Sequence, residues 1–210
     1  MRSGTTGSAV DRGQAHRHLL GAATDVSPEL HRAIAGAGPL WFPRRRTTDL
    51  AAFLCRSVVG QQLSVAAART IWSRLETGLA TSARALPERC RPETESTIRA
   101  CGVSRAKART LIEIRSADND GLLARATATR EQDERDALLR QIWGVGQWTC
   151  DMVSIFFCKD LDVWPEGDVS VRRAFVDLAG DDENGLDEAF RPCRSILALH
   201  LYRHLDNPVA

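Results

Sequence analysis

Long apolar runs are missing from this 210-residue sequence, and no stretch approaches the roughly 20 residues that a membrane-spanning helix needs. The first ten residues are small and polar, and they contain no apolar segment of the signal-peptide type. We therefore expect residues 1–10 to form a disordered tail and the protein to act in the cytoplasm.

Closely spaced cysteines are missing as well. The six cysteines lie at positions 55, 90, 101, 150, 158 and 193, so no pair has the short spacing of a structural zinc site or an iron–sulfur cluster. We expect reduced cysteines, several of them in the core, and no metal-ligating side chains.

Strand-like alternation of apolar and polar residues is absent, and so is any repeat of fixed period. Apolar residues instead recur at helical spacing, and Thr48 and Ser64 are the expected N-caps of two of the segments. The pattern predicts an all-α fold. The expected helices span residues 11–20, 28–36, 49–59, 65–76, 93–101, 104–115, 122–126, 131–141, 148–158, 169–179, 186–190 and 192–205.

Charge is unevenly distributed although the net charge is only +1. Residues 1–115 carry 18 basic and 9 acidic side chains, whereas residues 116–210 carry 10 and 18. This asymmetry indicates a polyanionic partner for the first half. Two solvated surfaces that compensate each other would give the same balance.

The segment 142–149 reads as a hairpin between two helices, because Gly144 and Gly146 interrupt the helical pattern. Glycine lets the backbone approach a ligand closely, and the free N–H groups at the start of the second helix favour a phosphate oxygen. An ordinary link with glycine as a C-cap remains the simpler alternative.

Two other segments admit two interpretations each. Trp41 and Phe42 precede three arginines, a combination that serves nucleic-acid binding or a hydrophobic plug beside a solvated charge run. Gln61 and Gln62 lie between two apolar helices, where they would contact base edges or serve as polar turn residues.

Several motifs in the right order resemble the endonuclease III superfamily of DNA glycosylases, from about Leu30 to the C-terminus. These are the hairpin and the loop 165–168 (Pro-Glu-Gly-Asp). Segments 60–64, 102–108 and 191–195, together with Trp148, are most similar to the 3-methyladenine DNA glycosylase II family. The resemblance implies two all-α lobes, about 11–58 plus 166–210 and about 59–165, with the active site in a cleft between them. It also implies the compact form, without an N-terminal β domain.

The resemblance makes Asp168 the expected catalytic residue, because the family's aspartate lies twenty positions after the residue at Trp148. A carboxylate there would stabilise oxocarbenium character on the sugar and orient a water. From the residues alone, Asp168 reads as the N-cap of the helix 169–179. Both roles are compatible.

Trp148 implies the reaction subtype. Bifunctional relatives carry a lysine here that forms a Schiff base, which tryptophan cannot do, so we expect a monofunctional glycosylase that leaves an abasic site. Its indole would stack on a cationic alkylated purine, or be a core aromatic at a helix start. The other residues expected near the base are Trp41, Phe42, Trp164, Met152 and Cys193, each of which can also be plain core.

The expected DNA contacts are the hairpin, which would hold a phosphate, and a wedge that fills the space of the flipped base. The hairpin contacts are Gly144, Val145, Gly146, Gln147 and Thr149, and the wedge is Gln62 or Leu63. No cofactor is expected beyond a monovalent cation at the carbonyls of Arg140, Ile142 and Val145. The chain departs from the family pattern at Trp143, usually proline, and at Cys193, often an aromatic.

These observations predict a base-excision-repair enzyme that removes alkylated purines from double-stranded DNA and acts as a monomer near the nucleoid. A glycosylase for another damaged or deaminated base, such as hypoxanthine or uracil, is the first alternative. The second is a helix-hairpin-helix module that binds DNA without catalysis.

Overall fold

The computed structural model describes residues 10–44, 47–79, 85–180 and 185–206. Within these ranges the chain forms helices and loops and no strand, so the predicted all-α fold is confirmed. The tail expected at residues 1–10 lies outside the described residues except for Val10. No described helix is both long and apolar enough to cross a membrane.

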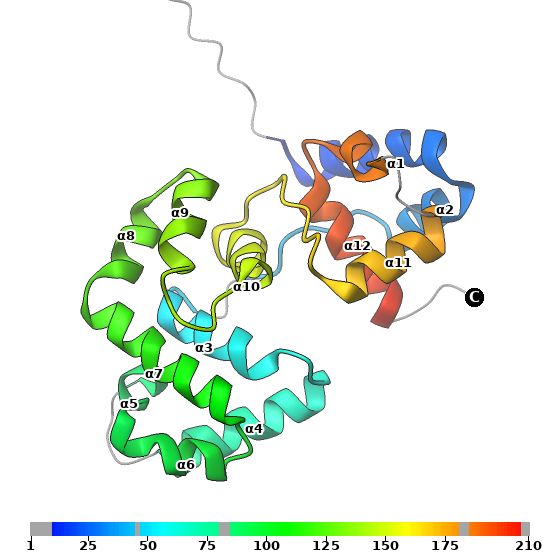
Figure 1. The fold of residues 1–210 in the computed structure, drawn as a ribbon. Coiled ribbons are helices and arrows are strands. Elements are labelled where there is room, and N and C mark those ends of the chain that lie inside the picture. The colour runs from blue at the N-terminus through cyan, green and yellow to red at the C-terminus, as the bar shows by residue number, and fades with distance from the viewer. Residues whose placement is uncertain (1–9, 45–46, 80–84, 181–184, 207–210) are drawn as a thin grey trace, which may run out of the picture. The chain divides into compact units, whose positions relative to one another are not determined.

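The chain divides into two compact units. The first combines residues 1–43 with 159–210, so it joins the blue and the orange-to-red ends of the chain, and the second contains residues 44–158 (Figure 1). Each unit has a hydrophobic core of its own. The unit boundaries therefore lie at 43/44 and 158/159, whereas the sequence suggested 58/59 and 165/166.

Four helices and a 3₁₀ turn are formed by the described residues of the first unit, and their caps are local. Asp11 and Gln14 form a capping box at the start of α1, and Ser27 caps α2 with Pro28 as the first helical residue. The Ser27 hydroxyl also donates to the carbonyl of Leu178 at 2.6 Å, which ties α2 to α11. The elements are α1 (Arg12–Val26), α2 (Pro28–Ala37), α11 (Val169–Ala179), η3 (Leu186–Phe190) and α12 (Arg194–Asp206).

The second unit begins with α3, which packs against α4, α7 and α10. These contacts explain why α3 belongs here and not with the N-terminal helices. Leu50, Leu54 and Val58 of α3 are buried, and Phe53 is half-buried against the ring of Phe157, 5.5 Å away between centroids. The elements are α3 (Leu50–Gly60), α4 (Val65–Gly78), α5 (Leu86–Arg89), η1 (Pro92–Thr94), α6 (Glu95–Ala100), α7 (Arg105–Asn119), α8 (Leu122–Ala128), α9 (Gln132–Leu139), α10 (Gln147–Met152) and the π-helical η2 (Val153–Cys158).

Three local predictions were wrong in detail. The N-cap of α3 is Asp49 and not Thr48, because the Asp49 carboxylate accepts the backbone N–H of Ala51 at 2.8 Å. The helix expected at 148–158 changes from α to π geometry at Val153. The short helix α5 was not expected, since its four residues are too few to show a period.

Candidate functional site

A tight turn joins α9 to α10 and requires glycine at one position. The N–H of Val145 donates to the carbonyl of Ile142 at 3.1 Å, so one of the carbonyls considered for a cation accepts a hydrogen bond within the turn. Gly144 has a φ of +84°, and a β-carbon there would lie 2.1 Å from Oγ1 of Thr110 on α7. Backbone conformation and close packing therefore both demand glycine.

The second glycine of the turn lies in open space. Gly146 is the N-cap of α10 and supplies no side-chain cap, and a β-carbon there would meet nothing within 4 Å. Gly144, Gly146 and Gln147 are exposed, whereas Val145 and Thr149 are buried. Among the five expected hairpin contacts, Val145 and Thr149 therefore have side chains that are not accessible from solvent.

The side chain of Gln147 is engaged within the hairpin. Its Nε2 donates to Oδ2 of Asp136 at 3.0 Å and to Oδ1 of Asp151 at 2.9 Å. Both carboxylates are buried, and the buried guanidinium of Arg135 nearby donates to the Ser154 hydroxyl at 2.8 Å. The amide thus crosslinks α9 to α10 and holds the turn that carries the exposed backbone.

The cysteine of the hairpin is chemically inert. Burial, followed by the carboxylates of Asp136 and Asp151, raises the pKa of the Cys150 thiol to about 12. The thiol stays protonated near neutral pH, so it is not a nucleophile.

The loop after α3 is tied to both the hairpin and α7. Nε2 of Gln61 donates to Oγ1 of Thr149 at 3.1 Å. Nζ of Lys107 donates to the carbonyls of Val59 at 3.0 Å and Gln61 at 2.7 Å, and burial lowers the pKa of this lysine. Gln61 is therefore a fixed residue of the loop and not a mobile polar turn residue.

The two candidate wedge residues form the exposed tip of the same loop. Gln62 has a φ of +56°, which few residues other than glycine adopt, and its side chain is exposed. Leu63 is 40% exposed, although apolar side chains of this size are usually buried. The strained backbone thus presents an amide and an isobutyl group to solvent.

Asp168 lies in the first unit as the N-cap of α11 and is only 7% exposed. Its Oδ1 accepts the backbone N–H groups of Ser170 at 2.9 Å and Val171 at 3.1 Å. Its Oδ2 accepts the hydroxyl of Tyr202 at 2.7 Å. The capping role read from the sequence is confirmed, and the carboxylate is held in one orientation from two sides.

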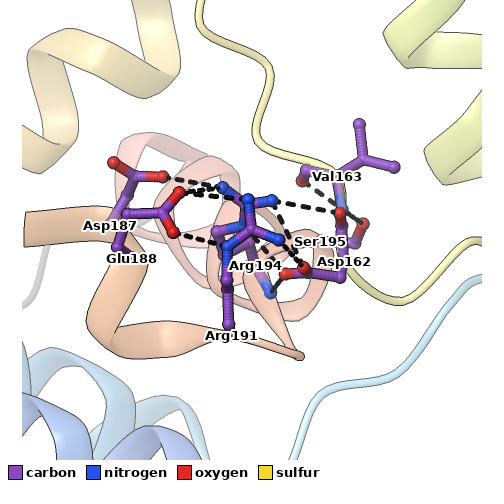
Figure 2. Close-up of polar contacts among 7 residues, drawn as sticks. All are labelled: Asp162, Val163, Asp187, Glu188, Arg191, Arg194 and Ser195. Carbon is purple, nitrogen blue, oxygen red and sulfur yellow. Dashed lines mark hydrogen bonds and ion pairs between the residues drawn. The ribbon is translucent and has the colours of Figure 1, made fainter. Parts of the chain in front are cut away.

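The loop that leads to Asp168 is fastened by the start of α12 (Figure 2). The N–H of Ser195 donates to the carbonyl of Leu161 at 3.0 Å, and the N–H of Val163 donates to Oγ of Ser195 at 3.0 Å. The Ser195 hydroxyl donates in turn to the carbonyl of Val163 at 3.3 Å. Loop and helix are therefore joined at two loop residues, Leu161 and Val163.

Arg194 reinforces this junction with a charge cluster. Arg194 is 8% exposed, and its guanidinium contacts Asp162 at 2.8 Å, Asp187 at 3.2 Å and Glu188 at 2.8 Å. Arg191 pairs with Asp162 and Glu188 at the edge of the cluster (Figure 2). The ion pair and hydrogen bonds between Arg194 and Asp162 therefore tie the loop to the start of α12.

The residues expected near the base divide between the units. Trp41 and Phe42 contact each other edge-to-face at 5.4 Å, and Trp164 contacts Phe175 of α11 at 5.3 Å. Cys193 is buried in the core of this first unit, where burial raises the pKa of its thiol. In the second unit, Trp148 is half-buried and Met152 is buried, one helical turn apart on α10.

Sequence reasoning missed the roles of Lys107, Arg194 and Tyr202. Lys107 and Arg194 lie in motifs that carried the family resemblance, but these motifs did not indicate which residues the two side chains contact. Tyr202 is the single tyrosine of the chain, and no pattern pointed to it.

Comparisons with known proteins agree with one another, although no family model matches the chain. DNA-3-methyladenine glycosylase 1 of Schizosaccharomyces pombe is 34% identical over 128 residues, which cover 58% of this chain and 54% of that protein. The chain thus spans about half the length of this curated relative.

Solved structures extend the likeness to nearly the whole chain. The 3-methyladenine DNA glycosylase of Schizosaccharomyces pombe in complex with abasic DNA has a TM-score of 0.75 at 26% identity, covering 93% of this chain and 98% of that one. A DNA-3-methyladenine glycosidase from Bacillus halodurans has a TM-score of 0.71 at 27% identity, covering 91% and 89%. In sequence and in fold, the chain is therefore similar to 3-methyladenine DNA glycosylases.

Proposed function

We propose that the protein is a monofunctional DNA glycosylase that hydrolyses the N-glycosidic bond of alkylated purines of the 3-methyladenine type. The observation that carries this proposal is the buried carboxylate of Asp168, which the start of α11 and Tyr202 hold in one orientation. A DNA-binding module without catalysis has no need of a carboxylate fixed in this way.

Asp168 supplies the chemistry. As the bond between C1′ and the base nitrogen breaks, the base leaves with the bonding electrons and positive charge develops on the sugar. The carboxylate stabilises that charge and accepts a proton from the water that adds to C1′. An N-alkylated purine already carries positive charge, so it leaves as a neutral base with little help from an acid.

Trp148 determines the product. Its indole has no amine for a Schiff base, so the base is released and the strand stays intact with an abasic site. The half-buried ring offers an electron-rich face, which attracts a cationic alkylated purine more strongly than a neutral base.

The hairpin and the loop tip handle the DNA. Backbone N–H groups near Gly144 and Gly146 bind a phosphate, because the turn is exposed and α10 starts without a side-chain cap. Gln62 or Leu63 enters the space that the flipped base vacates. The exposed side chains and fixed base of this loop support that role. Double-stranded DNA with damaged bases is the partner, a monomer suffices, and the enzyme acts in the cytoplasm beside the nucleoid.

Methylated duplex DNA tests the proposal. The protein should release 3-methyladenine, detected by chromatography, and strands should break only after alkali treatment. Nicking without alkali would contradict the monofunctional mechanism. Duplexes with hypoxanthine or uracil belong in the same series, because Cys193 stands where relatives often have an aromatic. Equal binding of damaged and undamaged DNA without base release would identify a binding module instead.

A further inference from the structure

The indole of Trp143 lies on the outside of the hairpin turn and is 42% exposed. Its neighbours in the turn, Ile142 and Val145, are buried in the core of the second unit. The guanidinium carbon of Arg109, on α7, lies 4.0 Å from the centre of the Trp143 ring. The guanidinium of Arg109 thus lies against an exposed tryptophan at the turn that is proposed to bind a phosphate.

The residues that follow Trp143 and Arg109 in the sequence also contact each other. Gly144, the next residue after Trp143, packs directly against Thr110, the next residue after Arg109. The turn and α7 therefore touch at adjacent positions. Arg109 therefore does not reach Trp143 through a flexible side chain alone, because the turn at Gly144 already packs against the side chain of Thr110.

A guanidinium that stacks on an indole keeps the N–H donors at its edge accessible for hydrogen bonds. The indole covers one face of the planar cation, while the N–H donors point outward in the plane. Glu113, one turn along α7, lies 3.8 Å from Nε of Arg109, and both side chains are largely exposed. Such an exposed pair contributes little, so it orients the arginine without neutralising it.

The start of α7 has a charge pattern that helix stability does not explain. Arg105, Lys107 and Arg109 occupy three of its first five positions, and its first turn has no acidic residue. Basic side chains at this end oppose the helix dipole. Lys107 binds carbonyls at the end of α3, whereas Arg105 and Arg109 are exposed and lie one turn apart on the same face.

We infer that Arg109, stacked on Trp143, binds a DNA phosphate beside the one at the Gly144–Gly146 turn, with Arg105 adding positive charge on the same face. The inference rests on the proposed function, because the DNA-binding role of the hairpin is part of it. The ligand is a phosphodiester of duplex DNA, and the contact reads no sequence. Its chemistry suits the planar fork of arginine, which binds two phosphate oxygens at once.

The salt dependence of binding to undamaged duplex DNA tests the inference. Fluorescence anisotropy gives the affinity from about 0.05 to 0.5 M salt, where each phosphate contact contributes a slope of about 0.9. Arg109→Gln should lower the slope by about 0.9, which weakens binding about eightfold at ~0.1 M salt. Trp143→Ala should give a smaller loss in the same direction, and Arg109→Lys should keep most of the slope.

The matched control is Arg56→Gln. Arg56 also lies over an indole, at 4.1 Å from the ring of Trp72, and belongs to the same unit. It sits on α3 and pairs with Glu76 at 3.6 Å. This variant should keep the wild-type slope, and thermal melting followed by circular dichroism should show all four variants folded.

The outcomes separate the inference from the proposed function. An unchanged slope in Arg109→Gln, or an equal loss in Arg56→Gln, would overturn the phosphate contact even if the wild type releases methylated bases. A wild type that shows the predicted slopes but releases no base would overturn the glycosylase proposal and leave the contact standing. A wild type that does not bind duplex DNA would overturn both.

Discussion

The hydroxyl of Tyr202 donates to Oδ2 of Asp168 at 2.7 Å, across 34 positions of sequence. The other oxygen of the same carboxylate accepts backbone N–H groups at the start of α11. One oxygen is thus committed to the helix and the other to a phenol, which fixes the plane of the carboxylate. Tyr202 therefore acts as a positioning residue for Asp168.

Removing this hydroxyl should change the chemistry more than the binding of DNA. A donor to a carboxylate stabilises its charged form. We expect Tyr202→Phe to lower kcat for base release roughly tenfold at little change in KM, a range typical of one lost positioning contact. An unchanged kcat, with only a lower melting temperature, would show that Tyr202 is merely structural.

The two hairpin glycines should respond differently to alanine. Gly144→Ala forces a strained φ and a clash with Thr110, so the free energy of unfolding should fall by roughly 2–4 kcal/mol. Gly146→Ala meets no neighbour and should stay within about 1 kcal/mol of the wild type, yet weaken DNA binding. Urea titration and anisotropy measure the two effects. Equal stability losses would contradict the packing described for Gly144.

Lys107 should matter for base flipping through the loop that it anchors. Lys107→Met removes both hydrogen bonds to the carbonyls of Val59 and Gln61. We expect excision from fully paired DNA to fall more than excision opposite a mismatch, where flipping is easy. Alanine at both Gln62 and Leu63 should give the same pattern more strongly. Equal losses on both substrates would count against a wedge in this loop.

The first unit should lose stability in mild acid because of His200. Burial, and secondarily His16, lowers the pKa of His200 to about 4, and neither ring nitrogen has a hydrogen-bond partner among the described residues. The unfolded chain takes up this proton near pH 6.5, before the folded one does. The neutral His200 therefore makes its full contribution to the free energy of unfolding above pH ~6.5. This contribution, on the order of 3 kcal/mol, is lost as pH falls toward 4.

His200→Phe should flatten this part of the pH dependence, measured by urea titration between about pH 4 and 7. His18→Gln, at an exposed position of α1, is the control and should keep the wild-type slope. A His200→Phe variant with the wild-type slope would show that other groups cause the acid sensitivity.

Local signals in the sequence predicted the helices and several of their caps. Ser27 before Pro28, Ser64 before α4 and Asp168 before α11 each cap the helix that follows, because a cap acts within three residues of itself. The family resemblance agrees with the similar proteins found, and the hairpin glycines do form the turn between α9 and α10. At α3 the N-cap was predicted at Thr48 but lies at Asp49, so such patterns locate a helix start to within about one residue.

Contacts between distant positions were beyond these signals. Tyr202 reaches Asp168 over 34 positions, Lys107 reaches Val59 over 48, and Arg194 reaches Asp162 over 32. Helical periodicity says which face of a helix is buried, and not which polar group meets it there. Gln147 is a similar case, since a DNA contact was expected and hydrogen bonds to Asp136 and Asp151 are found.

Substitution of Asp168 by asparagine tests the central claim most directly. The amide keeps the size of the side chain and an oxygen that can cap α11, so folding and binding of abasic-site DNA should stay close to wild type. Release of 3-methyladenine from methylated duplex DNA under single-turnover conditions should fall at least about a hundredfold. Base release at the wild-type rate by a folded Asp168→Asn variant would contradict the proposed mechanism.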